Sequence, residues 1–381
     1  MKISTEKILT THVGSMPRPQ NVVDYLFAED RGDAFDQQGY DDTMRQEVLN
    51  SAKNQTAAGV DIISDGEMSK ISYATYIRHR LTGFEIGEVP RATPKDLDEF
   101  PEFRDKLASA GGTPKYNRPI CRGSIAVKDL EPLKKDIENL KAAAQETGAT
   151  EAFMNAASPG VVAVFQPNEY YKSDEEYLQA LAEAMKIEYE MIVEAGLLLQ
   201  IDCPDLAMGR HIKFRDIDDN AFVINADLQV EALNFALSEI PADRVRMHLC
   251  WGNYEGPHTH DIPLEKVLPT VMNAKPQAVL FESANPRHSW EWQVWAEANI
   301  PDDKILIPGV LDTTTNFVEH PQLVAERIIK FAGIVGRERV MAGSDCGFGT
   351  FAGFGAIHPS ITWAKLRSMA EGARIASEQL W

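Results

Sequence analysis

Four residues of the types that bind transition metals stand at the ends of three short apolar stretches: His248, Cys250, Glu282 and Cys346. His248 and Cys250 are two residues apart, so on a strand both side chains leave the same face. One imidazole nitrogen, two thiolates and one carboxylate suit a tetrahedral Zn²⁺. The sequence therefore predicts a zinc site in which the Glu282 carboxylate is the labile ligand that leaves the metal open to a substrate.

Each of these residues also has a structural interpretation. A free cysteine commonly behaves as a small buried hydrophobe, and Glu282 could be an ion-pair partner at a strand end. For any one residue alone the structural interpretation is the better one. Because four such residues stand at strand ends, and because the carboxyl ends of barrel strands meet at one mouth, the set favours a metal site.

Polar residues at the ends of other apolar stretches predict contacts to a small substrate. Glu67 and Asp202 each follow such a stretch, and a carboxylate there could hold an ammonium group. The alternative for Glu67 is a first-turn helix acid. Ser15 follows a glycine in a turn whose N–H groups could cradle a carboxylate, although most Gly-Ser turns are only turns.

The loop after Cys250 carries two further histidines, His258 and His260. They could form a second metal site. A pair of loop histidines without a nearby cysteine is more often solvated or in contact with a substrate, and we expect that here.

Composition excludes several classes of partner. The chain has 381 residues, with 38 Lys and Arg against 57 Asp and Glu, giving a net charge of −19. No basic run is present, so nucleic acid and anionic membrane surfaces are not expected partners. No apolar stretch reaches the roughly 18 residues that span a bilayer, and the amino terminus lacks a signal-type apolar region. We expect a cytoplasmic protein with reduced cysteines, and the sequence leaves a homo-oligomer open.

Apolar stretches alternate with helical patterns along most of the chain, which is typical of a parallel sheet covered on both sides. The predicted strands are residues 8–15, 60–67, 151–159, 197–202, 244–251, 277–283, 304–312 and 339–346. The predicted helices are about residues 42–58, 174–195, 264–274, 290–298, 321–335 and 361–380.

The pattern predicts an α/β fold of the (β/α)8 TIM-barrel type, forming a single domain over residues 1–381. Residues 81–127 are predicted to be an insertion, in which residues 84–89 and 120–127 pair as an antiparallel hairpin. A doubly wound open sheet is the alternative, but it would place a ligand at one switch point. Here almost every strand ends in a polar or ligand-type residue, which favours the barrel.

These motifs occur in the order seen in the cobalamin-independent methionine synthases, and nearly the whole chain resembles the carboxy-terminal catalytic barrel of that family. The motifs that carry the resemblance are Gly14-Ser15, Asp65-Gly66-Glu67, Gln200-Ile201-Asp202, His248-Leu249-Cys250, Glu282, Pro308-Gly309-Val310-Leu311-Asp312 and Asp345-Cys346-Gly347. The long amino-terminal domain of the family is not found in this sequence, so we expect a short form.

The resemblance implies a zinc-dependent thiol alkyltransferase, most simply one that methylates homocysteine to methionine. It implies zinc held by the four residues above, and an amino-acid thiol held by Glu67, Asp202 and the turn backbone at Ser15. Asp312 is expected to orient a substrate or a neighbouring side chain, with a strand-end cap as the alternative. Zinc suits this chemistry because it deprotonates a bound thiol and leaves it nucleophilic.

Two departures from the family leave the alkyl donor open. Thr314 stands where the family has a histidine expected to protonate the folate leaving group, and Phe165 stands where a tryptophan stacks on the pterin. Short relatives are similar to enzymes that use a corrinoid donor, or that add the thiol of coenzyme M to epoxides. The runner-up function is therefore thiol addition to an epoxide or the reverse C–S cleavage, and a non-catalytic metal-binding or thiol-binding protein is a third possibility.

Overall fold

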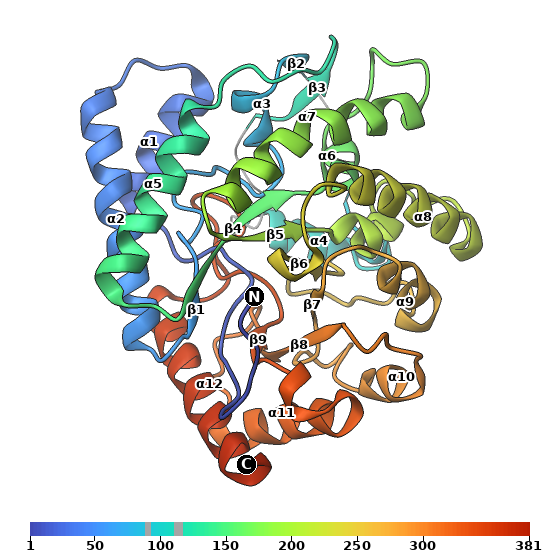
Figure 1. Ribbon diagram of the computed structural model, residues 1–381. Helices are drawn as coiled ribbons and strands as arrows, with labels where there is room; N and C mark the ends of the chain where they lie inside the picture. The colour runs from blue at the N-terminus through green and yellow to red at the C-terminus, as the bar shows by residue number, and fades with distance from the viewer. Residues whose placement is uncertain (88–92, 110–116) are drawn as a thin grey trace.

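The computed structural model describes residues 1–87, 93–109 and 117–381. A curled parallel sheet lies at its centre, with helices around the outside (Figure 1). Within the described residues the sheet has seven strands, in the order β1 (Ile62–Ile63), β4 (Glu151–Ala157), β5 (Leu198–Asp202), β6 (Val245–Leu249), β7 (Ala278–Phe281), β8 (Ile305–Leu311) and β9 (Gly343–Ser344). Neighbouring strands of this sheet are parallel throughout.

The predicted first strand, residues 8–15, closes the sheet into a ring. Its residues 9–11 lie between the two edge strands. Thr10 O accepts hydrogen bonds from the amides of Asp61 and Ile62 beside β1, at 3.1 and 3.0 Å. On the other side, Thr11 N donates to Ala342 O at 2.8 Å, and Ala342 N donates to Leu9 O at 2.9 Å. The barrel prediction is confirmed, and the open-sheet alternative is wrong because both edges are bridged.

The barrel interior is filled by apolar side chains from the strands and the closing segment: Leu9, Val13, Ile62, Phe153, Leu198, Ala278, Leu280, Ile305, Ile307 and Met341. In β6 the buried Arg246 lies among them, with its guanidinium 4.0 Å from the centre of the Phe153 ring. Arg246 donates to Thr11 Oγ1 at 2.8 Å and to His12 O at 2.6 Å. A buried cation therefore binds the closing segment to the opposite side of the ring.

The principal helices pack on the outer face of the ring, where their apolar faces join the larger hydrophobic cluster. They are α1 (Gln20–Arg31), α2 (Gln37–Ala57), α5 (Glu131–Thr147), α7 (Asp174–Glu194), α8 (Asp219–Ala236), α9 (Leu264–Met272), α10 (Trp292–Glu297), α11 (Pro321–Val335) and α12 (Pro359–Leu380). The six predicted helices are present within a few residues of the expected bounds. Helices α1, α5 and α8 were not predicted.

The insertion contains the predicted antiparallel hairpin in shorter form. Strand β2 (Phe84–Ile86) pairs with β3 (Pro119–Cys121), and the predicted residues 88–89 lie outside the described part of the chain. Between the two strands are a short 3₁₀ turn, η1 (Lys95–Asp98), and helix α4 (Pro101–Ser109). Asp96 accepts hydrogen bonds from Tyr254 Oη at 2.6 Å and from His258 N at 2.7 Å, so the insertion is fixed to the loop after β6.

The remaining short helical segments connect these elements: α3 (Ile77–Arg80), α6 (Pro159–Phe165), η2 (Pro204–Leu206), η3 (Met208–His211), η4 (Ala242–Arg244) and η5 (Arg337–Arg339). Across the described residues, no helix combines the length and the apolar character that crossing a membrane requires.

Candidate metal and substrate site

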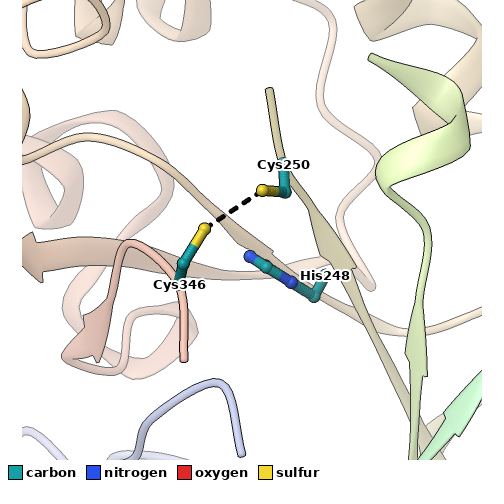
Figure 2. Close-up of side chains that lie close together, drawn as sticks. All are labelled: His248, Cys250 and Cys346. Atoms are coloured by element: carbon teal, nitrogen blue, oxygen red, sulfur yellow. Dashed lines mark hydrogen bonds between the residues drawn. The ribbon is translucent and has the colours of Figure 1, made fainter. Parts of the chain in front are cut away.

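Three of the four predicted metal ligands lie together at the carboxyl end of the barrel. His248 is in β6, Cys250 follows that strand, and Cys346 follows β9. The ligand atoms of these three buried residues all lie within 4.8 Å of one another, and the two sulfurs are 3.0 Å apart. Figure 2 shows the sulfurs facing each other with the His248 ring pointing toward them. All four cysteines of the chain are free thiols.

The fourth predicted ligand, Glu282, stands at the edge of this cluster. Its Oε1 accepts a hydrogen bond from Trp251 N at 2.7 Å and lies 3.9 Å from Cys346 Sγ. Its Oε2 accepts from Asn285 Nδ2 at 2.6 Å. Both carboxylate oxygens therefore accept hydrogen bonds from protein donors.

Asp345, next to Cys346, fixes the relative positions of the strand ends. Its Oδ1 accepts from Ser283 N and Ala284 N, and its Oδ2 from Asn285 N, each at 2.8 Å. The backbone after β7 is thereby bound to the end of β9. Because a Cβ on Gly309 would lie 2.0 Å from Asp345 Oδ1, a glycine is required there.

The protonation states of the cluster fit a site that needs a cation. Burial lowers the pKa of His248 to about 4, which leaves the imidazole neutral, the form that binds metals. The hydrogen bond with Cys346 lowers the pKa of Cys250, but burial and the Glu282 charge outweigh it and raise the value to about 11. Burial also raises the pKa of Cys346. Two neighbouring thiols that stay protonated can become thiolates together once a divalent cation compensates their charge.

The predicted substrate contacts lie in the same pocket as the metal cluster. A cavity of about 260 Å³ is lined by Ser15, Glu67, Asp202, His248, Cys250 and Cys346 among others. All six are buried, with Glu67 only 2% exposed. The structure thus brings together seven of the eight residues that the sequence singled out, counting Glu282 beside the cluster.

Glu67 is held in an uncommon backbone conformation. Its φ is 55°, in the left-handed region that non-glycine residues rarely adopt. Arg18 donates from Nε and Nη2 to Glu67 O, at 3.0 and 2.7 Å, and so fixes that backbone. Glu67 Oε2 is buried, and no described residue forms a hydrogen bond with it. Burial, with the nearby Asp202 charge, raises the pKa of Glu67 to about 8. A strained, unsatisfied carboxyl group facing a pocket is typical of a binding site.

Asp202 is oriented by amide side chains. Asn155 Nδ2 donates to its two oxygens at 3.2 and 3.0 Å, and Gln200 Nε2 donates to Oδ1 at 3.0 Å. Burial raises the pKa of Asp202 to about 6 in spite of these donors. Gly14 has φ 149° and lies against Asn155, since a Cβ there would be 2.3 Å from Asn155 Oδ1.

Asp312 is not among the residues that line the pocket. Its Oδ1 accepts from Thr314 N and Thr314 Oγ1, at 2.9 and 2.8 Å, and its Oδ2 accepts from Thr315 Oγ1 at 2.6 Å. These bonds agree with a strand-end cap, and they also orient the neighbouring Thr314 and Thr315 side chains, so the role of Asp312 stays a prediction.

The histidines of the loop after β6 have separate partners. His260 pairs with Glu99 at 2.6 Å, whereas His258 Nδ1 lies 2.9 Å from Asp261 Oδ2. His288 Nε2 lies 3.0 Å from the same Asp261 oxygen. The grouping of His258 with Asp261 and His288 could not be foreseen, because His288 follows a different strand.

Several pocket residues were not predicted from the sequence. Tyr73 and Phe351 both line the pocket and contact each other, with ring centres 5.8 Å apart. Asn253 donates to Gly347 O at 2.9 Å and to Thr350 Oγ1 at 2.7 Å, which ties the loops after β6 and β9 together. Asn155 could have indicated the site from the sequence, because its amide side chain stands among the apolar residues of strand β4.

Comparison with known proteins gives three kinds of likeness. Residues 8–90 match the family model described as the catalytic domain of cobalamin-independent synthase. Methionine synthases of Saccharolobus islandicus and Sulfurisphaera tokodaii are 26% and 23% identical over 376 residues, covering 97% of this chain and 95% and 93% of theirs. These matches confirm the resemblance inferred from the motifs.

Solved structures support the fold. A B12-independent methionine synthase from Shewanella, in complex with selenomethionine, superposes with a TM-score of 0.71 at 17% identity, covering 98% of this chain and 99% of that one. A protein from Listeria monocytogenes described as a putative vitamin-B12 independent methionine synthase gives 0.65 at 18% identity, with the same coverage.

Proposed function

From the relation of this chain to the cobalamin-independent methionine synthases and their methyltransferase activity, we propose that it transfers a methyl group to the sulfur of homocysteine or a close analogue. The observation that carries the proposal is the convergence of His248, Cys250 and Cys346 in one pocket with two buried carboxyl groups. This arrangement supplies a site for sulfur and, beside it, a site for an ammonium group.

The proposed metal is Zn²⁺, bound by His248, Cys250, Cys346 and, as the exchangeable ligand, Glu282. The donor set is the mixture of nitrogen, sulfur and oxygen ligands that zinc accepts. Bound there, Zn²⁺ would hold the substrate sulfur as a thiolate that stays nucleophilic near neutral pH. The hydrogen bonds from Trp251 and Asn285 keep Glu282 in place when the substrate sulfur takes its position.

The amino-acid end of the substrate is proposed to lie at Glu67, Asp202 and Ser15. Glu67 Oε2 lacks a hydrogen-bond partner among the described residues, and a substrate ammonium group would supply one. Binding that cation also favours ionisation of both carboxyl groups, whose pKa values are raised by burial. Coenzyme M carries a sulfonate in place of an ammonium group, so the two acids disfavour it as the thiol. The relative from Shewanella was solved with selenomethionine, an amino acid of the same shape as the proposed product.

Thr314, which replaces the histidine of the family, is not among the described residues that line the pocket, whereas Phe165 forms part of its aromatic wall. Both features accommodate a methyl donor other than folate. Epoxide opening by a thiol, or its reverse, is the second candidate reaction because it uses the same sulfur site with a different electrophile.

We also propose that residues 1–381 form one domain with residues 81–127 inserted into it, since one hydrophobic cluster extends from Ile8 to Ala376.

The test is a metal and activity measurement on the purified protein and two variants. We expect about one zinc per chain, and methionine formed from homocysteine with at least one of methyltetrahydrofolate, its polyglutamate or methylcobalamin. Cys346→Ser should lose both zinc and activity, whereas Cys121→Ser, a buried cysteine in β3, should keep both. Full zinc and activity in Cys346→Ser would overturn the proposal. An active protein that alkylates coenzyme M with an epoxide, and not homocysteine, would establish the second candidate.

A further inference from the structure

A second group of metal-binding residue types lies outside the pocket that holds the sulfur site. We call it the loop cluster, and its members are His211, His258, Asp261 and His288. His211 ends η3, which follows β5. His258 and Asp261 belong to the loop after β6, and His288 follows β7. None of the four is among the described residues that line the pocket, so the cluster joins three loops at one end of the barrel without facing the substrate.

Asp261 is at the centre of the loop cluster. Its Oδ2 lies 2.9 Å from His258 Nδ1 and 3.0 Å from His288 Nε2. Its Oδ1 lies 3.8 Å from His211 Nδ1. Zinc bonds of about 2.0–2.2 Å to nitrogen and oxygen place neighbouring ligand atoms of a tetrahedral site roughly 3.4 Å apart, which falls between these distances. The three imidazole nitrogens therefore surround one carboxylate at separations that a single ion can bridge.

The remaining nitrogen of each imidazole has an oxygen acceptor. The pairs are His211 Nε2 with Trp251 O at 2.9 Å, His258 Nε2 with Tyr254 O at 3.1 Å, and His288 Nδ1 with Glu291 Oε2 at 2.9 Å. When the outer nitrogen of a histidine donates its proton to a carbonyl or carboxylate, the inner nitrogen keeps the lone pair that binds a metal. Metal-binding histidines are usually held in this way.

Two atoms of the loop cluster are buried and form no hydrogen bond with a described residue: His211 Nδ1 and Asp261 Oδ1. They are the same two atoms that lie 3.8 Å apart, and their side chains are 0% and 4% exposed. Buried polar atoms normally have partners, so this pair indicates a ligand between them. His258 in addition has a φ of 52°, a strained backbone conformation that is typical of functional sites.

We propose that the loop cluster binds a second Zn²⁺ ion through His211, His258, Asp261 and His288. Three imidazoles and one carboxylate are ligands that zinc accepts, and the lack of a thiolate distinguishes this site from the sulfur site. Because the protein supplies all four ligands and the cluster lies outside the pocket, the ion is structural. The proposal does not depend on the proposed function.

Trp251 connects the loop cluster to the sulfur site. Its carbonyl lies 2.9 Å from His211 Nε2, and its ring stacks on the His288 ring with centres 4.2 Å apart. Its amide donates to Glu282 Oε1 at 2.7 Å. The residue after Cys250 thus contacts two ligands of the second ion and the exchangeable ligand of the first. The second ion clamps the loop that follows Cys250.

The test is a metal count on the full-length protein without a histidine tag, stripped with a chelator, reloaded with Zn²⁺ and freed of excess metal by gel filtration. We expect about two ions per chain, one at each site. The zinc that Cys346→Ser loses is the ion of the sulfur site, so this variant should keep about one ion, at the loop cluster. Circular dichroism verifies that each variant is folded.

His211→Gln should lose the ion of the loop cluster and keep the other. The glutamine amide can still donate to Trp251 O, but it places no ligand atom where His211 has Nδ1. His260→Gln is the matched control, because His260 belongs to the same loop as His258 but pairs with Glu99 outside the cluster. This variant should keep both ions.

Cobalt distinguishes the two sites without any variant. Co²⁺ bound by thiolates gives intense charge-transfer absorption, whereas Co²⁺ bound by nitrogen and oxygen gives only weak ligand-field bands. In a titration of the unmodified protein, we expect the charge-transfer absorption to saturate after about one equivalent has bound at the sulfur site, and the ligand-field bands to continue to about two. Cys346→Ser should retain only a weak spectrum of the nitrogen and oxygen type.

The outcomes separate this inference from the proposed function. About one ion per chain, lost in Cys346→Ser and kept in His211→Gln, would overturn the second site. The imidazoles of His258 and His288 would then be protonated ion-pair partners of Asp261. Two ions that His211→Gln also retains would overturn it as well. About one ion that Cys346→Ser keeps and His211→Gln loses would confirm the second site and overturn the metal of the proposed function, and no ion at all would overturn both.

Discussion

Asp202 Oδ1 lies 3.8 Å from Nδ1 of His248, across the pairing of β5 with β6 that sets these two residues side by side. The carboxylate proposed to hold an ammonium group therefore stands next to the imidazole proposed to hold the metal. A molecule whose ammonium group binds Asp202 and whose sulfur binds the proposed metal must have its nitrogen and its sulfur close together. This distance favours a short amino-acid thiol such as homocysteine.

Asp202→Asn tests that relationship. The variant keeps the size of the side chain but loses its charge and one acceptor oxygen, so the KM for homocysteine should rise by roughly tenfold to a hundredfold. For 1-butanethiol, which has no ammonium group, the KM should change little. Initial rates with both thiols measure the difference, and metal analysis verifies that zinc is kept. An equal effect on both thiols would remove Asp202 from ammonium binding.

Asn285→Ala tests the support of the exchangeable ligand. Asn285 Nδ2 donates to Glu282 Oε2 at 2.6 Å, and without it the carboxylate is free to rotate. Zinc affinity should fall by about 10-fold to 100-fold, the usual cost of losing a group that orients a ligand. Competition with a chromogenic chelator measures the affinity. Asn50→Ala, on α2, is a control that should leave it unchanged.

Glu67→Gly and Glu67→Ala separate the backbone of Glu67 from its carboxyl group. We expect both variants to lose substrate binding, but alanine keeps the penalty of a positive φ while glycine does not. Glu67→Gly should therefore be about 1 kcal/mol more stable than Glu67→Ala. Denaturant unfolding gives the two free energies. Equal stabilities would mean that Arg18 does not keep the left-handed conformation once the carboxyl group is gone.

The pH dependence of stability reports on the buried Glu67 carboxyl group. Burial and the Asp202 charge raise the pKa of Glu67 from 4.5 to about 8. Between these values the folded protein keeps a proton that the unfolded chain has released, so this group destabilises the fold progressively as pH rises through that window.

Glu67→Gln cannot titrate and should lack this effect. Between about pH 5 and about pH 8, the free energy of unfolding of the unmodified protein should fall relative to the variant by on the order of 4 kcal/mol. Denaturant unfolding at several pH values measures the difference. A constant difference across the window would show that Glu67 is already ionised at pH 5.

The sequence was informative at most of the buried strands that end in a polar residue. In a parallel barrel all carboxyl ends point to one mouth, so Glu67, Asp202, His248 and Cys346 could be assigned to one place without knowing any distance. Their roles as ligands and substrate contacts stay predictions. The hairpin of the insertion was also predicted, because β2 and β3 lie outside the regular strand and helix alternation.

Contacts that depend on loop conformation could not be predicted in this way. Asp312 follows a strand like the others, but its carboxylate folds back onto Thr314 and Thr315, a local choice that residue type does not reveal. The position of α4 over the pocket likewise depends on tertiary contacts of Asp96 and Asp98 with distant loops. Neither periodicity nor composition records such contacts.

The closing segment has a consequence for how the protein is made. Leu9 and Thr11 leave the ribosome early, but their hydrogen-bond partner Ala342 is synthesised more than three hundred residues later. Until then the ring has an open seam, and Ser15, which continues from that segment, has no fixed place opposite Cys346. The pocket can therefore be completed only after residue 342 has been translated, when the seam between Leu9, Thr11 and Ala342 can form.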